Sequence, residues 1–266
     1  MRRAIIPVIL VAVLVTSALL SGCATTEPGK SSGDVITEAK DFTGFTRVAV
    51  EGTFDVNITR SDTYSILISA DTDFYDYVAV TKEGDTLRIY LNPRHTFTDF
   101  TRLAKTLKAE ITMPALYELQ LSGASDGSVS GFKSSDDFNL GVSGASSCTI
   151  DDSVVGDVEL EVSGASQVSG KVDAGDIEFD VSGASTIKLE GSANNITLNA
   201  SGASDIDLED FPLNNAYVDL SGASKSTVNV KGRLDCMLSA AAKLYFLGNP
   251  SMGNVNISGA STIKHK

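Results

Sequence analysis

The chain has 266 residues, a length that fits one large domain or two small ones. A hydrophobic content of 42% is enough for a core and excludes extended disorder, and 23 glycines with 6 prolines favour many short strands joined by tight turns. The net charge of −13 argues against nucleic acid and against anionic lipid headgroups as partners, because both would be repelled.

The first residues have the pattern of a leader peptide. A basic pair, Arg2 and Arg3, precedes an apolar stretch over residues 5–20 that is too short for a comfortable membrane span. A basic start, an apolar centre and small residues before the cleavage point are typical of export signals. We therefore expect residues 1–22 to be removed from an exported protein.

The cleavage point itself resembles the bacterial lipobox. Leu20-Ser21-Gly22-Cys23 has the small residues that fit the peptidase and the cysteine whose sulfur receives diacylglycerol. By this resemblance 1–22 is a lipoprotein signal peptide, and Cys23 is lipidated and anchored to the cell envelope by fatty acyl chains such as palmitate. Ala24 stands where an Asp would be needed for inner-membrane retention, which favours the outer membrane in a Gram-negative cell. The alternative is an ordinary secretory leader with a cysteine there by chance.

After the lipidated cysteine we expect a flexible tether over 23–41, because the residues after Cys23 are small and polar. From about Phe42 apolar and polar residues alternate, as they do in strands. Residues 96–107 fit a strand poorly and are interpreted as an inserted loop or short helix. We take 42–115 as an N-terminal β region of degenerate rungs with this insertion. The alternating apolar sets are Val48, Val50, Val56 and Ile58, then Ile66 and Ile68, Val78 and Val80, and Leu87, Ile89 and Leu91.

A tetrapeptide repeat then dominates 116–266. Copies recur every 18 to 21 residues, a spacing that indicates a solenoid. A fainter copy aligns Val50–Val56 with Leu121–Gly127, so the coil is predicted to begin near residue 45. Ser-Gly-Ala-Ser begins at Ser122, Ser143, Ser163, Ser182, Ser201, Ser221 and Ser258, and a degenerate Ser-Ala-Ala-Ala begins at Ser239.

Each repeat is predicted to form two short strands and a corner. Counted from the first serine as zero, positions −3 and −1 are apolar and their neighbours mostly polar, a period of two that places alternate side chains inward. We expect the glycine to adopt a positive φ at the corner, and the alanine at +2 to point into the crowded interior. Ser239-Ala240-Ala241-Ala242 lacks the glycine, which suggests a different turn there.

The two remaining cysteines, Cys148 and Cys236, fall at inward positions +5 and −3. Five rungs at about 4.8 Å each would hold them more than about 20 Å apart. A disulfide needs Cα atoms within about 7 Å. We therefore expect two unpaired cysteines that act as small core residues.

These features together resemble a known family. An exported lipoprotein with Leu/Val-x-Val-Ser-Gly-Ala-Ser repeats is similar to the head GIN domain family of "putative auto-transporter adhesins", over roughly Phe42 to His265, and Met113–Ser125 looks like the entry into that family's repeats. The resemblance implies an all-β, right-handed parallel β-helix. It supplies no catalytic residues.

Two functions remain open from the sequence. The first is a non-catalytic envelope module that presents its repetitive surface to a glycan or a protein, with Tyr217 as a candidate aromatic platform. The second is a carbohydrate-active enzyme, a lyase or hydrolase of the parallel β-helix type. The chain has two histidines, His95 and His265, and neither has an orienting partner visible in sequence. We therefore expect no enzyme and no cofactor.

Four acidic residues form the one cluster that could hold a ligand. Positions −4 and −2 of two adjacent repeats are acidic, so the four side chains should share one outward face over two rungs. The interpretations are a solvated acidic face and a weak divalent-cation site, since Ca²⁺ prefers several carboxylate oxygens. The four residues are Glu159, Glu161, Glu178 and Asp180.

Overall fold

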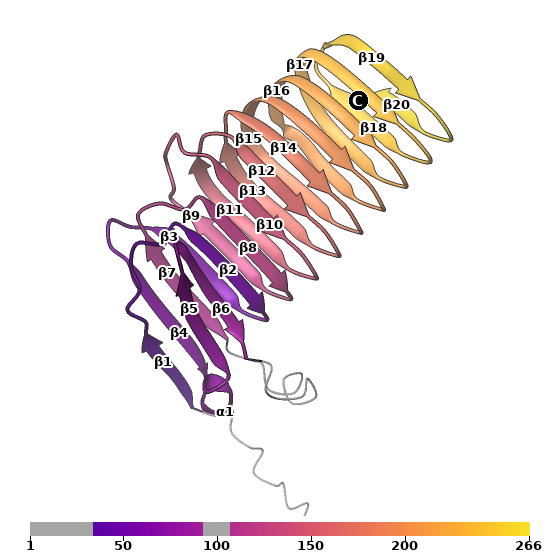
Figure 1. The fold of residues 1–266 in the computed structure, drawn as a ribbon. Helices are drawn as coiled ribbons and strands as arrows, with labels where there is room; N and C mark the ends of the chain where they lie inside the picture. Colours follow the sequence, from indigo (N-terminus) through magenta and orange to yellow (C-terminus); the bar gives the residue numbers. More distant parts are fainter. Residues whose placement is uncertain (1–33, 93–106) are drawn as a thin grey trace, which may run out of the picture. The chain divides into compact units, whose positions relative to one another are not determined.

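A computed structural model describes residues 34–92 and 107–266, and every structural statement below concerns these residues. They form a β-solenoid of about seven turns with rungs about 20 residues apart, which confirms the predicted all-β fold. Figure 1 shows the strands stacked in a row, with β1, β4 and β5 at one end and β19 and β20 at the other. The leader, Cys23 and His95 lie outside the described residues.

The strands and the one described helix have the following bounds: β1 (Val35–Ala39), β2 (Arg47–Gly52), β3 (Asp55–Arg60), β4 (Ser65–Asp71), α1 (Thr72–Tyr75), β5 (Val78–Glu83), β6 (Thr86–Leu91), β7 (Lys108–Met113), β8 (Glu118–Gly123), β9 (Asp126–Ser130), β10 (Phe138–Val142), β11 (Ser147–Val154), β12 (Val158–Val162), β13 (Gln167–Asp173), β14 (Asp176–Val181), β15 (Thr186–Ala200), β16 (Asp205–Leu220), β17 (Lys225–Leu238), β18 (Lys243–Leu247), β19 (Ser251–Ile257) and β20 (Thr262–His265). Since α1 is only four residues long, no helix in the described part of the chain could span a bilayer.

Two faces of the solenoid meet at the Ser-Gly-Ala-Ser corner. Face A contains β6, β2, β8, β10, β12, β14, the C-terminal halves of β15, β16 and β17, and β19. Face B contains β7, β3, β9, β11, β13, the N-terminal halves of β15, β16 and β17, then β18 and β20. Within each of these faces neighbouring strands run parallel, as predicted.

The core is a set of columns between these faces. At position −3, Leu160 pairs in register with Phe179 and then with Leu198, and all three are buried. Positions −3 and −1 therefore point inward as the two-residue period predicted. One rung alone has no partner for its apolar side, so stacking is what buries the core.

The rungs at the N-terminal end do not stack in chain order. Val48 of β2 pairs with Leu87 of β6 on one side and with Leu119 of β8 on the other. The β2–β3 rung thus lies between the β6–β7 rung and the β8–β9 rung. The predicted alignment of Val50–Val56 with the first regular repeat is confirmed, because Val50 pairs in register with Leu121.

Antiparallel strands extend both faces beyond the β6–β7 rung. β5 pairs antiparallel with β6 on face A, while β4 pairs antiparallel with β7 and then with β1 on face B. β1 begins at Val35, inside the segment 23–41 that was assigned to the tether, so the fold starts earlier than residue 42. Its side chains are mostly exposed. Most of the predicted insertion, up to residue 106, lies outside the described residues.

The corner corrects one expectation. Ala184 at +2 is exposed, whereas Ser185 at +3 is buried. The Ser185 hydroxyl donates a hydrogen bond of 2.8 Å to the carbonyl oxygen of Ser182, and the equivalent bond recurs at Ser166, Ser204 and Ser224. A serine is suited to the inside of this turn because it fills little space and closes the turn with its own hydroxyl.

The degenerate repeat corrects a second expectation. Ala240 has φ of 60°, in the same left-handed region as the corner glycine Gly222 at 69°. The turn is therefore the ordinary corner, occupied by a residue that is strained in it. Ala242 takes the buried place of the second serine.

Cys148 and Cys236 are both free and buried, as predicted. Burial is the main cause that raises the pKa of Cys148 to about 12, with the charge of Asp126 contributing in the same direction. The thiol therefore stays neutral at physiological pH.

Candidate functional site

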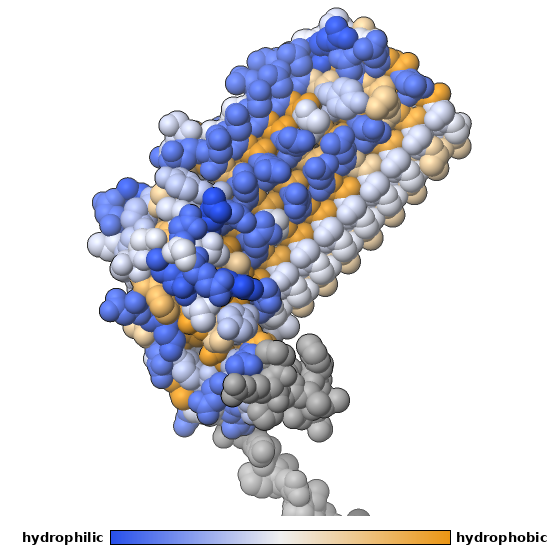
Figure 2. Space-filling model, in the orientation of Figure 1, coloured by the Kyte–Doolittle hydropathy of each residue, from blue (hydrophilic) through white to orange (hydrophobic). Residues whose placement is uncertain are grey.

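The outward side of face A carries a polar groove. Position −4 faces outward on every rung because positions −3 and −1 face inward. Along this column Glu118 pairs with Asn139, which pairs with Glu159 in turn. The register continues through Glu178, Thr197 and Tyr217. Figure 2 shows hydrophilic rows running across the strands of the displayed surface.

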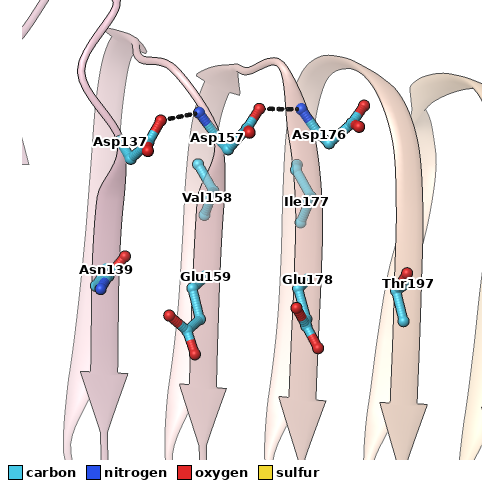
Figure 3. A pocket seen from close by; sticks show the side chains of 9 residues that line it. All are labelled: Asp137, Asn139, Asp157, Val158, Glu159, Asp176, Ile177, Glu178 and Thr197. Atoms are coloured by element: carbon cyan, nitrogen blue, oxygen red, sulfur yellow. Dashed lines mark hydrogen bonds between the residues drawn. The ribbon is translucent and has the colours of Figure 1, made fainter.

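Two adjoining hollows make up this face-A groove. One, of about 330 Å³, is lined by Asn139, Glu159 and Glu178, and the other, of about 650 Å³, reaches Tyr117 and Arg47. Asp137, Asn139 and Glu159 line both hollows, so the two lie next to each other. Figure 3 shows the carboxylates of Glu159 and Glu178 side by side on neighbouring strands.

A ladder of aspartates forms one wall of the groove. Asp137 accepts a hydrogen bond of 2.9 Å from the backbone N–H of Asp157, and Asp157 accepts one of 2.8 Å from the N–H of Asp176 (Figure 3). Each aspartate stands at position −6 and ties its rung to the next. One oxygen of each of Asp137 and Asp157 is therefore engaged by the fold.

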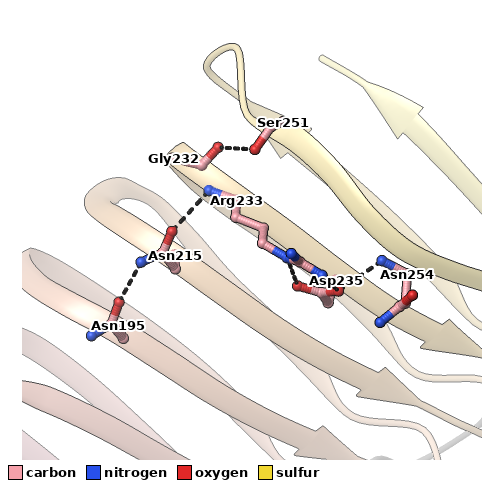
Figure 4. Close-up of polar contacts among 7 residues, drawn as sticks. All are labelled: Asn195, Asn215, Gly232, Arg233, Asp235, Ser251 and Asn254. Atoms are coloured by element: carbon pink, nitrogen blue, oxygen red, sulfur yellow. Dashed lines mark hydrogen bonds and ion pairs between the residues drawn. The ribbon is translucent and has the colours of Figure 1, made fainter.

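The ladder continues beyond the groove with amides. Asn195 donates a hydrogen bond of 2.8 Å to Asp176. Figure 4 shows the next two bonds, in which Asn215 donates to Asn195 at 2.8 Å and the backbone N–H of Arg233 donates to Asn215 at 2.9 Å. This ladder was not predicted from the sequence. The signal was present, because position −6 is Asp or Asn in five consecutive repeats.

The ladder ends beside an ion pair. The Arg233 guanidinium contacts Asp235 at 2.6 and 2.8 Å, and the backbone N–H of Asn254 donates to the same carboxylate at 2.7 Å. These bonds, with that of Arg233 the strongest, lower the pKa of Asp235 to about 2. Asp235 therefore remains ionised and links the last two rungs of face A.

The four acidic residues singled out in sequence do share face A. Glu159 pairs in register with Glu178, and Glu161 with Asp180. Only Glu159 and Glu178 line the groove, while Asp180 accepts a hydrogen bond of 3.0 Å from Asn199 on the next rung. Within residues 34–92 and 107–266 no three or more His, Cys, Asp or Glu side chains are grouped to hold a metal ion.

The aromatic residues of face A differ in their relation to the groove. Tyr117, 38% exposed, lines the larger hollow beside Arg47 and Glu118. Tyr217, 40% exposed, lies in the same outward column but lines neither hollow. Tyr217 was the aromatic platform predicted from the sequence, whereas Tyr117, which lies just before the first regular rung, was not predicted.

The groove combines the side chains that hold sugars in proteins. Tyr117 offers an apolar ring surface, the carboxylates accept hydrogen bonds from hydroxyls, and Arg47 donates them. Of the two histidines, His265 is described, and its Nε2 lies 2.8 Å from the carbonyl oxygen of Gly248, at the far end of the stack from the groove. It is thus remote from every groove carboxylate.

Solved structures share this fold. A putative adhesin from Parabacteroides merdae ATCC 43184 has a TM-score of 0.74 at 15% identity, covering 88% of this chain and 97% of that one. A putative adhesin from Parabacteroides distasonis ATCC 8503 has a TM-score of 0.74 at 16% identity, with coverages of 88% and 98%. A putative lipid binding protein from the same strain has a TM-score of 0.72 at 16% identity, with coverages of 88% and 97%.

No curated protein matches the sequence. The family model described as "Putative auto-transporter adhesin, head GIN domain" matches residues 44–250. The match covers the N-terminal rungs and nearly all of the regular repeats, in agreement with the resemblance noted from the repeats themselves. The chain therefore belongs to this head GIN domain family of putative auto-transporter adhesins.

Proposed function

We propose that this protein is a non-catalytic, adhesin-like module of the cell envelope that binds an uncharged glycan in the face-A groove. The observation that carries the proposal is the adjacency of the two hollows, which line up Tyr117, Asn139, Glu159 and Glu178 over several rungs. A repeating ligand suits a site whose residues repeat at about 4.8 Å. Anionic glycans would be repelled by the groove carboxylates.

Membership of an adhesin family supports a surface location and a binding role. Of the three solved structures described above, two are named as putative adhesins and one as a putative lipid binding protein. The carbohydrate-active alternative needs an acid and a base free to act on substrate. In the groove the ladder engages one oxygen each of Asp137 and Asp157 in tying rungs together, so Glu159 and Glu178 are the pair on which that alternative would depend.

The second part of the proposed function is attachment to the membrane through a lipid on Cys23. A lipid on Cys23 and a tether up to β1 would hold the solenoid to the membrane, outer in a Gram-negative cell, with residues 1–22 removed. Mass spectrometry of the mature N-terminal peptide tests this part. We expect Cys23 as the first residue with acyl chains attached; an unmodified Cys23 or a different first residue would contradict it.

A glycan array tests the groove. The mature chain should bind a subset of uncharged envelope glycans, and Tyr117→Ala should reduce that binding at least about tenfold, the loss of one stacking contact in a hydrogen-bonded site. Tyr217→Ala is the matched control, an equally exposed tyrosine on the same face outside the groove. Equal losses in both variants, or binding confined to anionic glycans, would refute the proposal.

A further inference from the structure

The last described rung, formed by β19 and β20, has one edge that pairs with no other described residues. In the regular rungs the carbonyl oxygens at positions −1, +1 and +3 accept hydrogen bonds from the following rung, as Ser182, Ala184 and Thr186 show by donating to Val162, Gly164 and Ser166 at 2.7 to 2.9 Å. β19 and β20 pair only with the preceding rung. The equivalent carbonyls of the last rung have no following rung among the described residues. They belong to Ile257, Gly259 and Ser261.

The same edge exposes core positions. Val255 and Ile257 are each 42% exposed, whereas their predecessors one rung earlier, Cys236 and Leu238, are 0% and 2% exposed. β19 carries no charged residue. Natural edge strands are usually protected by charges, prolines or bulges. The edge formed by β19 and β20 is here called the terminal edge, and its β19 half lacks charge and proline whereas its β20 half carries Lys264.

Charge changes sign toward this edge. Residues 225–266 contain six lysines and arginines and one acid, Asp235, whereas residues 107–224 contain four basic residues and twenty acids. Three of the six pair with acids: Lys225 with Asp205 at 3.1 Å, Arg233 with Asp235, and Lys266 with Glu209. In the described part of the chain Lys231, Lys243 and Lys264 have no acidic partner within salt-bridge distance, and Lys264 is in β20 itself.

We propose that the terminal edge binds a segment of a partner protein shaped like one more rung, with alternate apolar residues that cover Val255 and Ile257 and acidic residues that meet Lys264 and are attracted by Lys243 one rung behind it. The segment would add its backbone to the sheet, as in other cases of strand addition. Charge complementarity selects this occupant, because the edge is the basic end of an acidic protein. The groove lies on other rungs, so this site does not depend on the proposed function.

The chain contains a precedent for such a contact. Asp205 of one rung lies beside Lys225 of the next and forms an ion pair with it. The segment Asn195–Glu209 has an apolar strand, a corner and three outward acids. If a copy of this segment were added beyond the last rung in the same register, its Leu198 would lie over Val255 and its Asp207 beside Lys264.

A synthetic peptide copying Asn195–Glu209 is therefore the probe. Fluorescence anisotropy should show saturable binding to the full mature chain in detergent. Lys243→Glu with Lys264→Glu should weaken binding at least about tenfold, and a peptide with lysines at its three acids should bind the parent as weakly. The control Lys171→Glu with Lys188→Glu, two exposed lysines of face B in earlier rungs, should bind within about twofold of the parent. Absent binding, or equal losses in both double variants, would overturn the proposal.

Two further measurements separate strand addition from simple attraction and from self-assembly. N-methylation of alternate peptide residues blocks pairing along one side of a strand, so one of the two alternating patterns should abolish binding and the other should preserve it. Equal binding of both patterns would overturn strand addition. Sedimentation velocity of the chain without peptide should show no association. Association that Lys243→Glu with Lys264→Glu abolishes would make a second copy the occupant and overturn the proposal.

Discussion

Gly222 lies so close to Gly202 of the preceding rung that a Cβ on Gly222 would be 2.5 Å from the Gly202 carbonyl oxygen. Gly222 also has φ of 69°, where a side chain is strained whatever the space. Gly222→Ala should therefore lower the free energy of unfolding by about 1–3 kcal/mol. Chemical denaturation measures this, and an unchanged midpoint would contradict the close stacking of the corners.

Ala240 provides the opposite test at the same corner position. Its φ of 60° costs an alanine about 1–2 kcal/mol that a glycine does not pay. Ala240→Gly should therefore raise the free energy of unfolding by about 1 kcal/mol, since part of the relief is offset by the greater freedom of glycine in the unfolded chain. Denaturation of the single variant against the parent decides the sign; destabilisation would show that Ala240 is not strained.

Two buried serines should respond to alanine in opposite ways. Ser226 is fully buried at an inward position of face B and its hydroxyl has no hydrogen-bond partner, whereas Ser185 donates to Ser182. Ser226→Ala should stabilise the fold by about 1 kcal/mol, because an unpaired polar group leaves the core. Ser185→Ala should destabilise it by a similar amount. A matched pair of denaturation curves tests this, and shifts of the same sign would refute it.

Cys148 should make stability depend on pH in the alkaline range. The folded state retains the thiol proton up to its raised pKa of about 12, while the unfolded thiol loses it above an ordinary value of 9.0. The stabilising contribution is therefore complete below pH 9 and is lost as pH rises toward 12. Relative to Cys148→Val, the parent should lose about 2 kcal/mol between pH 7 and pH 10.5. A difference between the two proteins that does not change with pH would contradict a buried neutral thiol.

Much of the fold was readable from the sequence because its repeats are regular. The apolar residues at −3 and −1 predicted which side of each strand faces inward. The spacing of the repeats predicted the parallel register, and this register showed that Cys148 and Cys236 lie on rungs too far apart for a disulfide. The copy at Val50 was found for the same reason, although its partner Leu121 lies far along the chain.

The features that were missed depend on contacts that a pattern does not encode. Alanine and serine are both small, so composition alone could not tell that Ser185, not Ala184, turns inward; the deciding factor is the hydroxyl bond to Ser182. The position of β2 between β6 and β8 depends on pairing between distant segments. Tyr117 lines the groove together with Asp137 and Asn139 of the next rung.

Hydroxyl-radical footprinting of the mature chain with its bound glycan tests the central claim most directly. The rate of oxidation is measured at Tyr117 in the groove, at Tyr217 elsewhere on face A and at Tyr245 on face B. We predict that saturating glycan slows oxidation of Tyr117 and leaves Tyr217 and Tyr245 unchanged. Protection of Tyr217 or Tyr245 without protection of Tyr117 would place the ligand elsewhere and contradict the assignment of the groove as the binding site.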